Sequence, residues 1–142
     1  MKLVVDANVL FAALLKDGGT RKLLFDPRVT LIAPRFIAEE FLLKKPELLR
    51  KAGCLEKELD AMLATLLEKI TLANDEQLKP FLPAAASLTT DRKDWLYLAA
   101  ALYANAELWS HDKQMTRQAR VKCWSTKELM EKLGLQKQVT RG

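Results

Sequence analysis

The chain has 142 residues, of which 49% are hydrophobic and 29% are charged, and its formal net charge is +5 at pH 7. Only five glycines and five prolines are present, so the composition excludes a disordered or fibrous chain and is typical of a globular protein. The length is that of one domain, which we expect to span residues 1–142, and no apolar run reaches the roughly 18 residues that a membrane span needs.

The first apolar run, at residues 2–5, predicts a short buried strand that ends at Asp6. Asp6 and Asn8 interrupt an apolar stretch that would otherwise look like a secretion signal, so we expect a cytoplasmic protein. A helix is expected from about Val9 to the turn at residues 17–19, which contains two glycines.

A second strand is expected at residues 29–33, after a short helix at residues 21–25. Pro34 then opens a helix, and we expect Pro46 to interrupt it and to begin another short helix. The apolar face of the helix after Pro34 is expected to hold Ile37, Phe41 and Leu42.

The middle of the chain continues this alternation. Residues 55–67 repeat apolar side chains at helical spacing, and we expect this helix to form a hairpin with the preceding one. A third strand is expected at residues 70–73. Residues 74–90 contain two prolines and are expected to be the least regular part.

In the C-terminal third, Asp91 is expected to cap a strongly apolar helix at residues 92–103, which leads to a strand at residues 106–110. A last strand is expected at residues 121–124, and a capping-box sequence from Ser125 opens a final helix. Because strands alternate with helices, we expect an α/β protein with a mainly parallel sheet and helices on both faces.

Four carboxylates follow the predicted strands or begin nearby helices: Asp6, Glu40, Asp94 and Asp112. In open α/β sheets, polar groups that do chemistry lie just beyond the carboxyl ends of strands, so Asp6 and Asp112 are candidates for one crevice. Each carboxylate also has a structural alternative. Asp6 can cap a helix, and Asp91 or Asp94 can stabilise the first turn of one. Glu40 and Asp112 can be solvated surface residues.

In their order and setting, these carboxylates resemble the PIN-domain family of metal-dependent ribonucleases, which includes the VapC-type toxins. The family pattern is an Asp closing strand one, a Glu on a following helix, an Asp opening an apolar helix, and a Ser/Thr-x-Asp after the next strand. The matching segments are residues 4–10, 37–41, 94–102 and 110–113. The resemblance implies a three-layer α/β/α PIN-like fold with a mainly parallel central sheet.

The resemblance also implies a metal site. Its expected metal ligands and catalytic groups are Asp6, Glu40, Asp94 and Asp112. Glu40 would be either a ligand or the group that orients the attacking water, and Asn8 and Ser110 would hold the carboxylates in place. Carboxylates are hard oxygen ligands of the kind that Mg²⁺ and Mn²⁺ prefer, and such ions activate water and stabilise a departing oxygen.

The activity implied is that of a Mg²⁺- or Mn²⁺-dependent endoribonuclease with an RNA substrate. Similarity to VapC-type toxins further implies an antitoxin protein as partner, and a homodimer. An RNA-processing nuclease and a catalytically silent module that binds RNA or protein are the alternatives. A receiver-like signalling domain shares the layout, but it would need an acidic pair after strand one, where this chain has Asp6 alone.

Basic residues concentrate near the C-terminus. Residues 113–142 hold eight Lys or Arg against two Glu, whereas the preceding 112 residues hold 15 basic and 16 acidic groups. A basic segment beside an acidic site suits a polyanion whose backbone must approach metal-binding carboxylates. A solvated surface that keeps the protein in solution is the alternative.

Two further expectations concern the edge of the site. His111 lies between Ser110 and Asp112, where it can act as a general acid, contact phosphate, or point away from the site. If Asn8 caps the first helix, the N-terminus of that helix points toward the crevice and favours phosphate there.

Overall fold

The computed structural model describes residues 1–135, which contain a sheet of five parallel strands in the order β3-β2-β1-β4-β5. The strands are β1 (Lys2–Val5), β2 (Thr30–Pro34), β3 (Ile70–Ala73), β4 (Glu107–Trp109) and β5 (Cys123–Trp124). Strand β1 lies at the centre, paired with β2 on one side and β4 on the other. Its Leu3, Val4 and Val5 are fully buried, as is usual for a strand covered on both faces.

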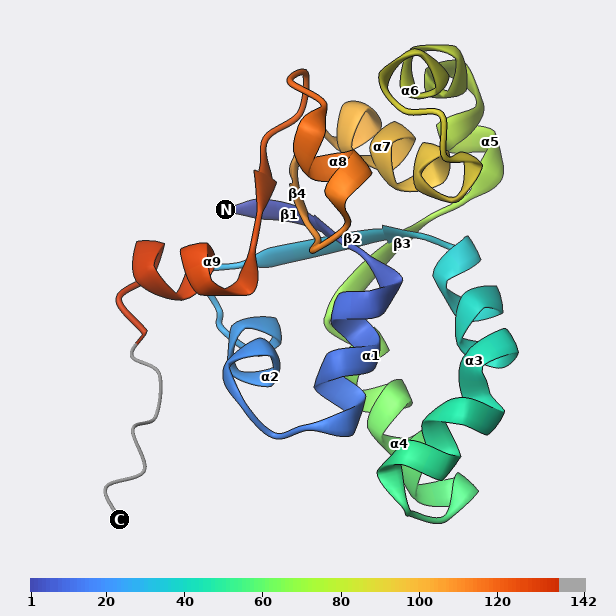
Figure 1. Cartoon of the computed structure of the whole chain (residues 1–142), viewed down its shortest axis with the longest axis vertical. Coiled ribbons are helices and arrows are strands. Elements are labelled where there is room, and N and C mark those ends of the chain that lie inside the picture. The colour runs from blue at the N-terminus through green and yellow to red at the C-terminus, as the bar shows by residue number, and fades with distance from the viewer. Residues whose placement is uncertain (136–142) are drawn as a thin grey trace.

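Helices cover both faces of this sheet, so the fold is a three-layer α/β/α arrangement, as the sequence predicts (Figure 1). One layer holds α1 (Ala7–Leu15), α2 (Gly19–Leu24), α3 (Phe36–Ala52) and α4 (Glu56–Leu67). The other holds α5 (Asp75–Leu78), α6 (Leu82–Leu88), α7 (Arg92–Ala104) and α8 (Lys113–Arg117). The last helix, α9 (Thr126–Lys132), packs against α2.

Several local predictions are confirmed by the structure. Strands β1 and β3 have the predicted bounds, and Asp91 caps α7 by accepting a hydrogen bond from the backbone N–H of Lys93 (3.1 Å). Ser125 and Glu128 form both hydrogen bonds of the predicted capping box at the start of α9.

Helix α3 corrects two predictions. Pro46 does not end the helix, which continues through it to Ala52 and stops before Gly53, whose φ of 62° is left-handed. Buried Phe41 and Leu48 lie on either side of Pro46, so packing of both halves offsets the lost backbone hydrogen bond. Leu42 is 66% exposed and does not share the buried face.

The stretch expected to be least regular is largely helical. It forms α5, a 3₁₀ turn η1 (Lys79–Phe81) and α6. Pro80 and Pro83 occupy the first or second positions of η1 and α6, where a missing N–H costs little. A capping box between Asn74 and Gln77 closes the start of α5. Helix α8 was also not predicted.

No helix within residues 1–135 combines the length and apolar character needed to cross a membrane. Lys137 and Arg141, which contribute to the basic C-terminal segment, lie outside the described residues.

Candidate metal centre

The carboxyl ends of three neighbouring strands meet at one small cavity of about 60 Å³. Asp6 follows β1, Asp112 follows β4, and Glu40 lies on the helix after β2. Asp94 lies in the first turn of α7, which packs on the face of β1, β2 and β4. Eight residues line the cavity: Asp6, Asn8, Glu40, Asp91, Lys93, Asp94, Tyr97 and Asp112. The four predicted carboxylates are therefore brought together in one cavity.

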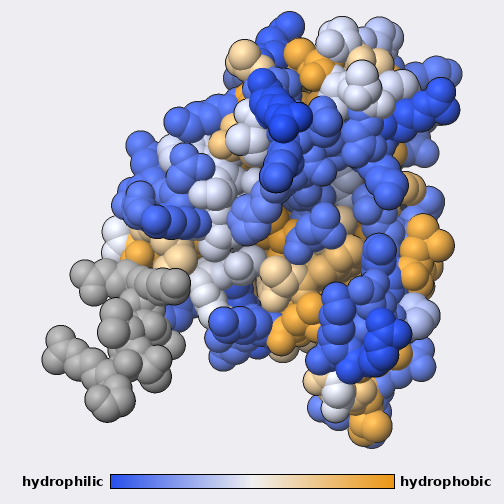
Figure 2. Space-filling model, in the orientation of Figure 1, coloured by the Kyte–Doolittle hydropathy of each residue, from blue (hydrophilic) through white to orange (hydrophobic). Residues whose placement is uncertain are grey.

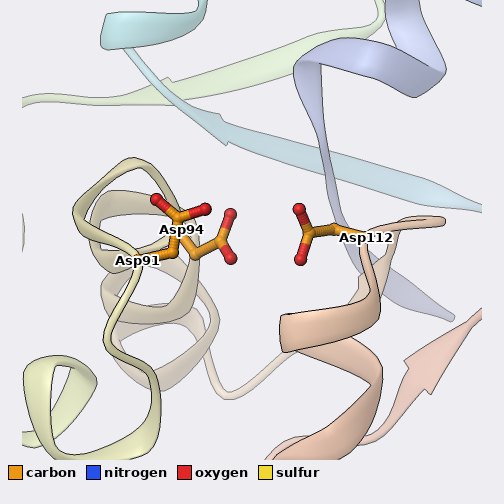
Figure 3. Close-up of side chains that lie close together, drawn as sticks. All are labelled: Asp91, Asp94 and Asp112. Carbon is orange, nitrogen blue, oxygen red and sulfur yellow. The ribbon is translucent and has the colours of Figure 1, made fainter.

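Three aspartates form the tightest part of this cluster. Asp91, Asp94 and Asp112 each offer a carboxylate oxygen, and these oxygens lie within 4.8 Å of one another. Asp91 and Asp94 face Asp112 across the cavity (Figure 3). The Oδ2 atom of Asp94 is buried and has no hydrogen-bond partner among residues 1–135. A buried carboxylate oxygen needs a partner, and a hard divalent cation between the three aspartates would supply one.

The charge of Asp94 is strongly disfavoured without such a cation. Burial, together with repulsion by Asp112, Asp91 and Asp6, raises the pKa of Asp94 from its ordinary value of 3.8 to about 7. A divalent cation would reverse this balance by attracting the same carboxylates.

Asp6 is held by a serine that also forms a hydrogen bond with the backbone of Asp112. The buried Ser110 hydroxyl donates to Asp6 Oδ2 at 2.7 Å and accepts a hydrogen bond from the backbone N–H of Asp112 at 3.0 Å. One hydroxyl thus fixes the Asp6 carboxylate relative to the loop after β4. Burial raises the pKa of Asp6, and the charge of Asp112 adds to it, while the Ser110 hydrogen bond opposes it.

Glu40 is oriented by a buried tyrosine. The Tyr97 hydroxyl donates to Glu40 Oε1 at 2.6 Å, joining α7 to α3 across the cavity. Burial raises the pKa of Glu40, and the hydrogen bond from Tyr97 opposes that rise. Burial also raises the pKa of Tyr97, so its hydroxyl keeps the proton that it donates.

Asp112 and Asp91 each combine a cap with a place in the cavity. Asp112 Oδ1 accepts hydrogen bonds from the backbone N–H groups of Gln114 (2.8 Å) and Met115 (3.2 Å) at the start of α8. Asp91 caps α7 in the same way. Because each cap uses one carboxylate oxygen, the other remains free to face the cavity.

A family model described as a PIN domain matches residues 4–134. The chain belongs to the PIN-domain family. A search of curated proteins found no match to this chain. PIN domains are generally nucleases and usually use divalent metals, which agrees with a cavity that is lined mainly by carboxylates.

Asp91 belongs to the carboxylate cluster of this PIN domain, but it was not among the metal ligands expected from the sequence. Its capping role was predicted, but its carboxylate lies in the tightest cluster as well. The spacing of three residues between Asp91 and Asp94 places both at the start of one helix, which is the available sequence signal. Their approach to Asp112 depends on the packing of α7 against α8.

Asn8 does not have the capping role considered for it, and His111 points away from the cavity, which is one of the alternatives that the sequence left open. Helix α1 begins at Ala7, with Asp6 at the N-cap position that the sequence left open for it, so Asn8 does not cap this helix. Asn8 lines the cavity, but within residues 1–135 its side chain forms no hydrogen bond to a carboxylate. His111 lies outside the cavity lining. Its Nε2 accepts a hydrogen bond from the backbone N–H of Thr126 (3.1 Å), which turns the ring toward α9.

Proposed function

We propose that this PIN domain is a Mg²⁺- or Mn²⁺-dependent endoribonuclease. The observation that carries the proposal is the Asp94 carboxylate, which is buried without a partner for Oδ2 and lies against Asp91 and Asp112. The same donor set suits either ion, because both are hard cations with oxygen ligands.

Asp91, Asp94 and Asp112 would hold a cation directly, and Asp6 lies in the same cavity for a further contact. When bound, the cation supplies a water of lowered pKa and positive charge beside the phosphate oxygens. Ser110 keeps Asp6 in place through its 2.7 Å hydrogen bond, so the cavity keeps its shape as substrate enters.

Glu40 is the group best placed to move a proton. Its Oε1 is occupied by the Tyr97 hydroxyl, which leaves Oε2 to accept a proton from the attacking water. As the water oxygen bonds to phosphorus, the bond from phosphorus to the leaving ribose oxygen breaks, and that oxygen takes up a proton from solvent water. The pKa of Glu40 is raised toward neutral pH, and a general base is more effective when its pKa lies near the pH at which it works.

Lys93 supplies positive charge at the rim of this acidic cavity. It is exposed and lines the cavity beside Asp91 and Asp94. The ammonium group also favours the ionised form of Glu40, because it lowers the pKa of that carboxyl. We assign to Lys93 a contact with the phosphate that enters the cavity.

We further assign the VapC-type toxin role, with an antitoxin protein as partner and a homodimer as the assembly. Exposed leucines on α3 support a protein partner, because Leu42 is 66% and Leu43 is 78% exposed. Figure 2 shows hydrophobic surface along this helix. An exposed apolar patch of this kind is typical of a binding surface.

The experiment is cleavage of labelled single-stranded RNA by the full chain in Mg²⁺, in Mn²⁺ and in chelator. We expect cleavage with either ion, none in chelator, and loss of cleavage in Asp112→Asn. Asp75→Asn is the matched control, because Asp75 is an exposed aspartate outside the cavity. RNA that is bound but left intact with every ion would contradict the nuclease and favour the silent binding module.

A further inference from the structure

A second and larger cavity of about 480 Å³ lies near the opposite ends of the strands from the carboxylates. Helix α7 begins beside the carboxylates and ends at this cavity, where Leu102 and Asn105 line it. Glu107, the first residue of β4, lines it too, which places the cavity at the amino ends of the strands. Arg120 and Lys122 complete its polar rim.

Exposed basic residues lie along the chain segment that leads from the first cavity to the second. Helix α8 starts at Asp112 in the carboxylate cluster, and the chain then leads to the second cavity before it enters β5. Four cations follow this path: Lys113, Arg117, Arg120 and Lys122. None of the four forms an ion pair within the described part of the chain, unlike Lys45, which contacts both Glu56 and Asp60. Figure 2 shows strongly hydrophilic surface over α8.

Lys122, the last of these four basic residues, is held in place by an aromatic ring. The Lys122 ammonium lies 4.1 Å from the centre of the Trp124 ring, and Trp124 Nε1 donates to Glu107 Oε1 at 3.0 Å. A cation over an aromatic face is held in place without being neutralised. Glu107 brings one negative charge to the cavity, but Arg120 and Lys122 outweigh it.

We propose that this second cavity, together with the surface of α8, is a subsite for single-stranded RNA that extends from the metal centre. The inference rests on the nuclease proposed above, and it adds where the strand runs beyond the cleaved phosphate. A strand rises about 3.3 Å per residue, so Glu107 lies about 10 Å from Ser110, a distance that a few nucleotides cover. Unpaired cations suit the phosphates, and the apolar side chain of Leu102 in the cavity lining suits a base.

The test measures RNA binding in chelator, so that no cleavage takes place. The double variant Arg120→Gln/Lys122→Gln is compared with Lys57→Gln/Lys69→Gln, which removes two exposed lysines near α4 and gives the same net charge. Fluorescence anisotropy reports binding of a dinucleotide and of an oligomer of about 12 nucleotides at several salt concentrations. Arg117→Gln serves as a second variant, because it leaves the contact between Lys122 and Trp124 intact.

We expect weaker binding of the oligomer by the double variant and a salt dependence whose slope falls by about 1.4, or about 0.7 for each lost contact with a single strand. Binding of the dinucleotide and the behaviour of the control pair should not change. Equal losses in the control pair, an unchanged slope, or binding of an acidic peptide in place of RNA would overturn the proposal. Because binding is read without metal, failure of the nuclease would appear separately, as an absence of cleavage.

Discussion

The Asp94 side chain places a carboxyl group where one buried oxygen has no hydrogen-bond partner among the described residues. Its neighbours Asp91 and Asp112 are also acidic, so each charge makes the others less favourable. A site of this kind is stable in two ways, either by keeping a proton on Asp94 or by binding a cation. The competition between proton and cation is the main property of the site at the scale of single residues.

The first prediction follows from the pKa of Asp94, which is about 7 in the folded chain against an ordinary 3.8. Between pH 3.8 and about 7, the folded chain keeps a proton on Asp94 that the unfolded chain has lost. The free energy of unfolding is therefore larger at acidic pH, and this contribution is lost as the pH rises through about 7. In chelator, the melting temperature should fall between about pH 5 and pH 8. Asp94→Asn should reduce this fall.

Thermal unfolding at several pH values checks this prediction. Asp75→Asn is the matched control, since Asp75 is exposed and lies outside the cavity. Added Mg²⁺ should raise the melting temperature more at pH 8 than at pH 5, because the cation then has no proton to displace. A melting temperature that falls equally in Asp94→Asn and in the native chain would contradict the assignment.

The second prediction concerns Tyr97→Phe. Loss of the hydroxyl removes the hydrogen bond that lowers the pKa of Glu40, so that pKa should rise further. The acidic limb of the cleavage profile should move to higher pH, and the rate at neutral pH should fall about tenfold, the cost of one hydrogen bond to a charged group. The measurement is the rate of RNA cleavage against pH.

Tyr103→Phe is the control for this substitution. Tyr103 also uses its hydroxyl in a hydrogen bond, with Gln77 Nε2 at 2.9 Å, but it lies outside the cavity. A profile that keeps its shape while the overall rate drops in Tyr97→Phe would point to a purely structural role for Tyr97.

At the scale of elements, helix α3 carries an internal proline at an exposed position. The third prediction is that Pro46→Ala stabilises the protein by about 1–3 kcal/mol, because alanine restores a backbone hydrogen bond and removes the clash of the ring with the preceding turn. Chemical denaturation measures the change. Pro83→Ala, at the start of α6, should change stability little. A loss of stability in Pro46→Ala would show that the proline is needed where it stands.

The elements also show what the sequence can and cannot predict. Strands β1 and β3 matched their predicted bounds because short apolar runs between polar residues carry their own signal. The course of α3 through Pro46 could not be predicted, because packing on both sides of the proline outweighs its local cost. For the same reason the sequence predicted the capping role of Asp91 but not its approach to Asp112.

At the scale of the whole molecule, the parallel order of strands explains why distant residues share one cavity. Asp6 and Ser110 are separated by 104 positions, yet they follow neighbouring strands and form a 2.7 Å hydrogen bond. The order of the four carboxylates along the chain predicted this convergence. The link between Tyr97 and Glu40 was not predictable, since a tyrosine in an apolar helix is ordinarily a core residue.

The two cavities lie at opposite ends of the strands and differ in the charge of the residues that line them. The acidic one lies at the carboxyl ends of the strands, the basic one at their amino ends, and α8 runs between them. Attraction of a polyanion by the basic surface would offset its repulsion by the carboxylates until a divalent cation is bound.

The most direct test of the central claim, that the carboxylate cluster binds a divalent cation, is titration of the full chain with Mn²⁺, with free ion followed by electron paramagnetic resonance. We predict saturable binding by the native chain and by Asp75→Asn, and strongly weakened binding by Asp94→Asn and Asp112→Asn. Binding that is equal in all four proteins, or absent from the native chain, would contradict the metal centre and with it the proposed chemistry.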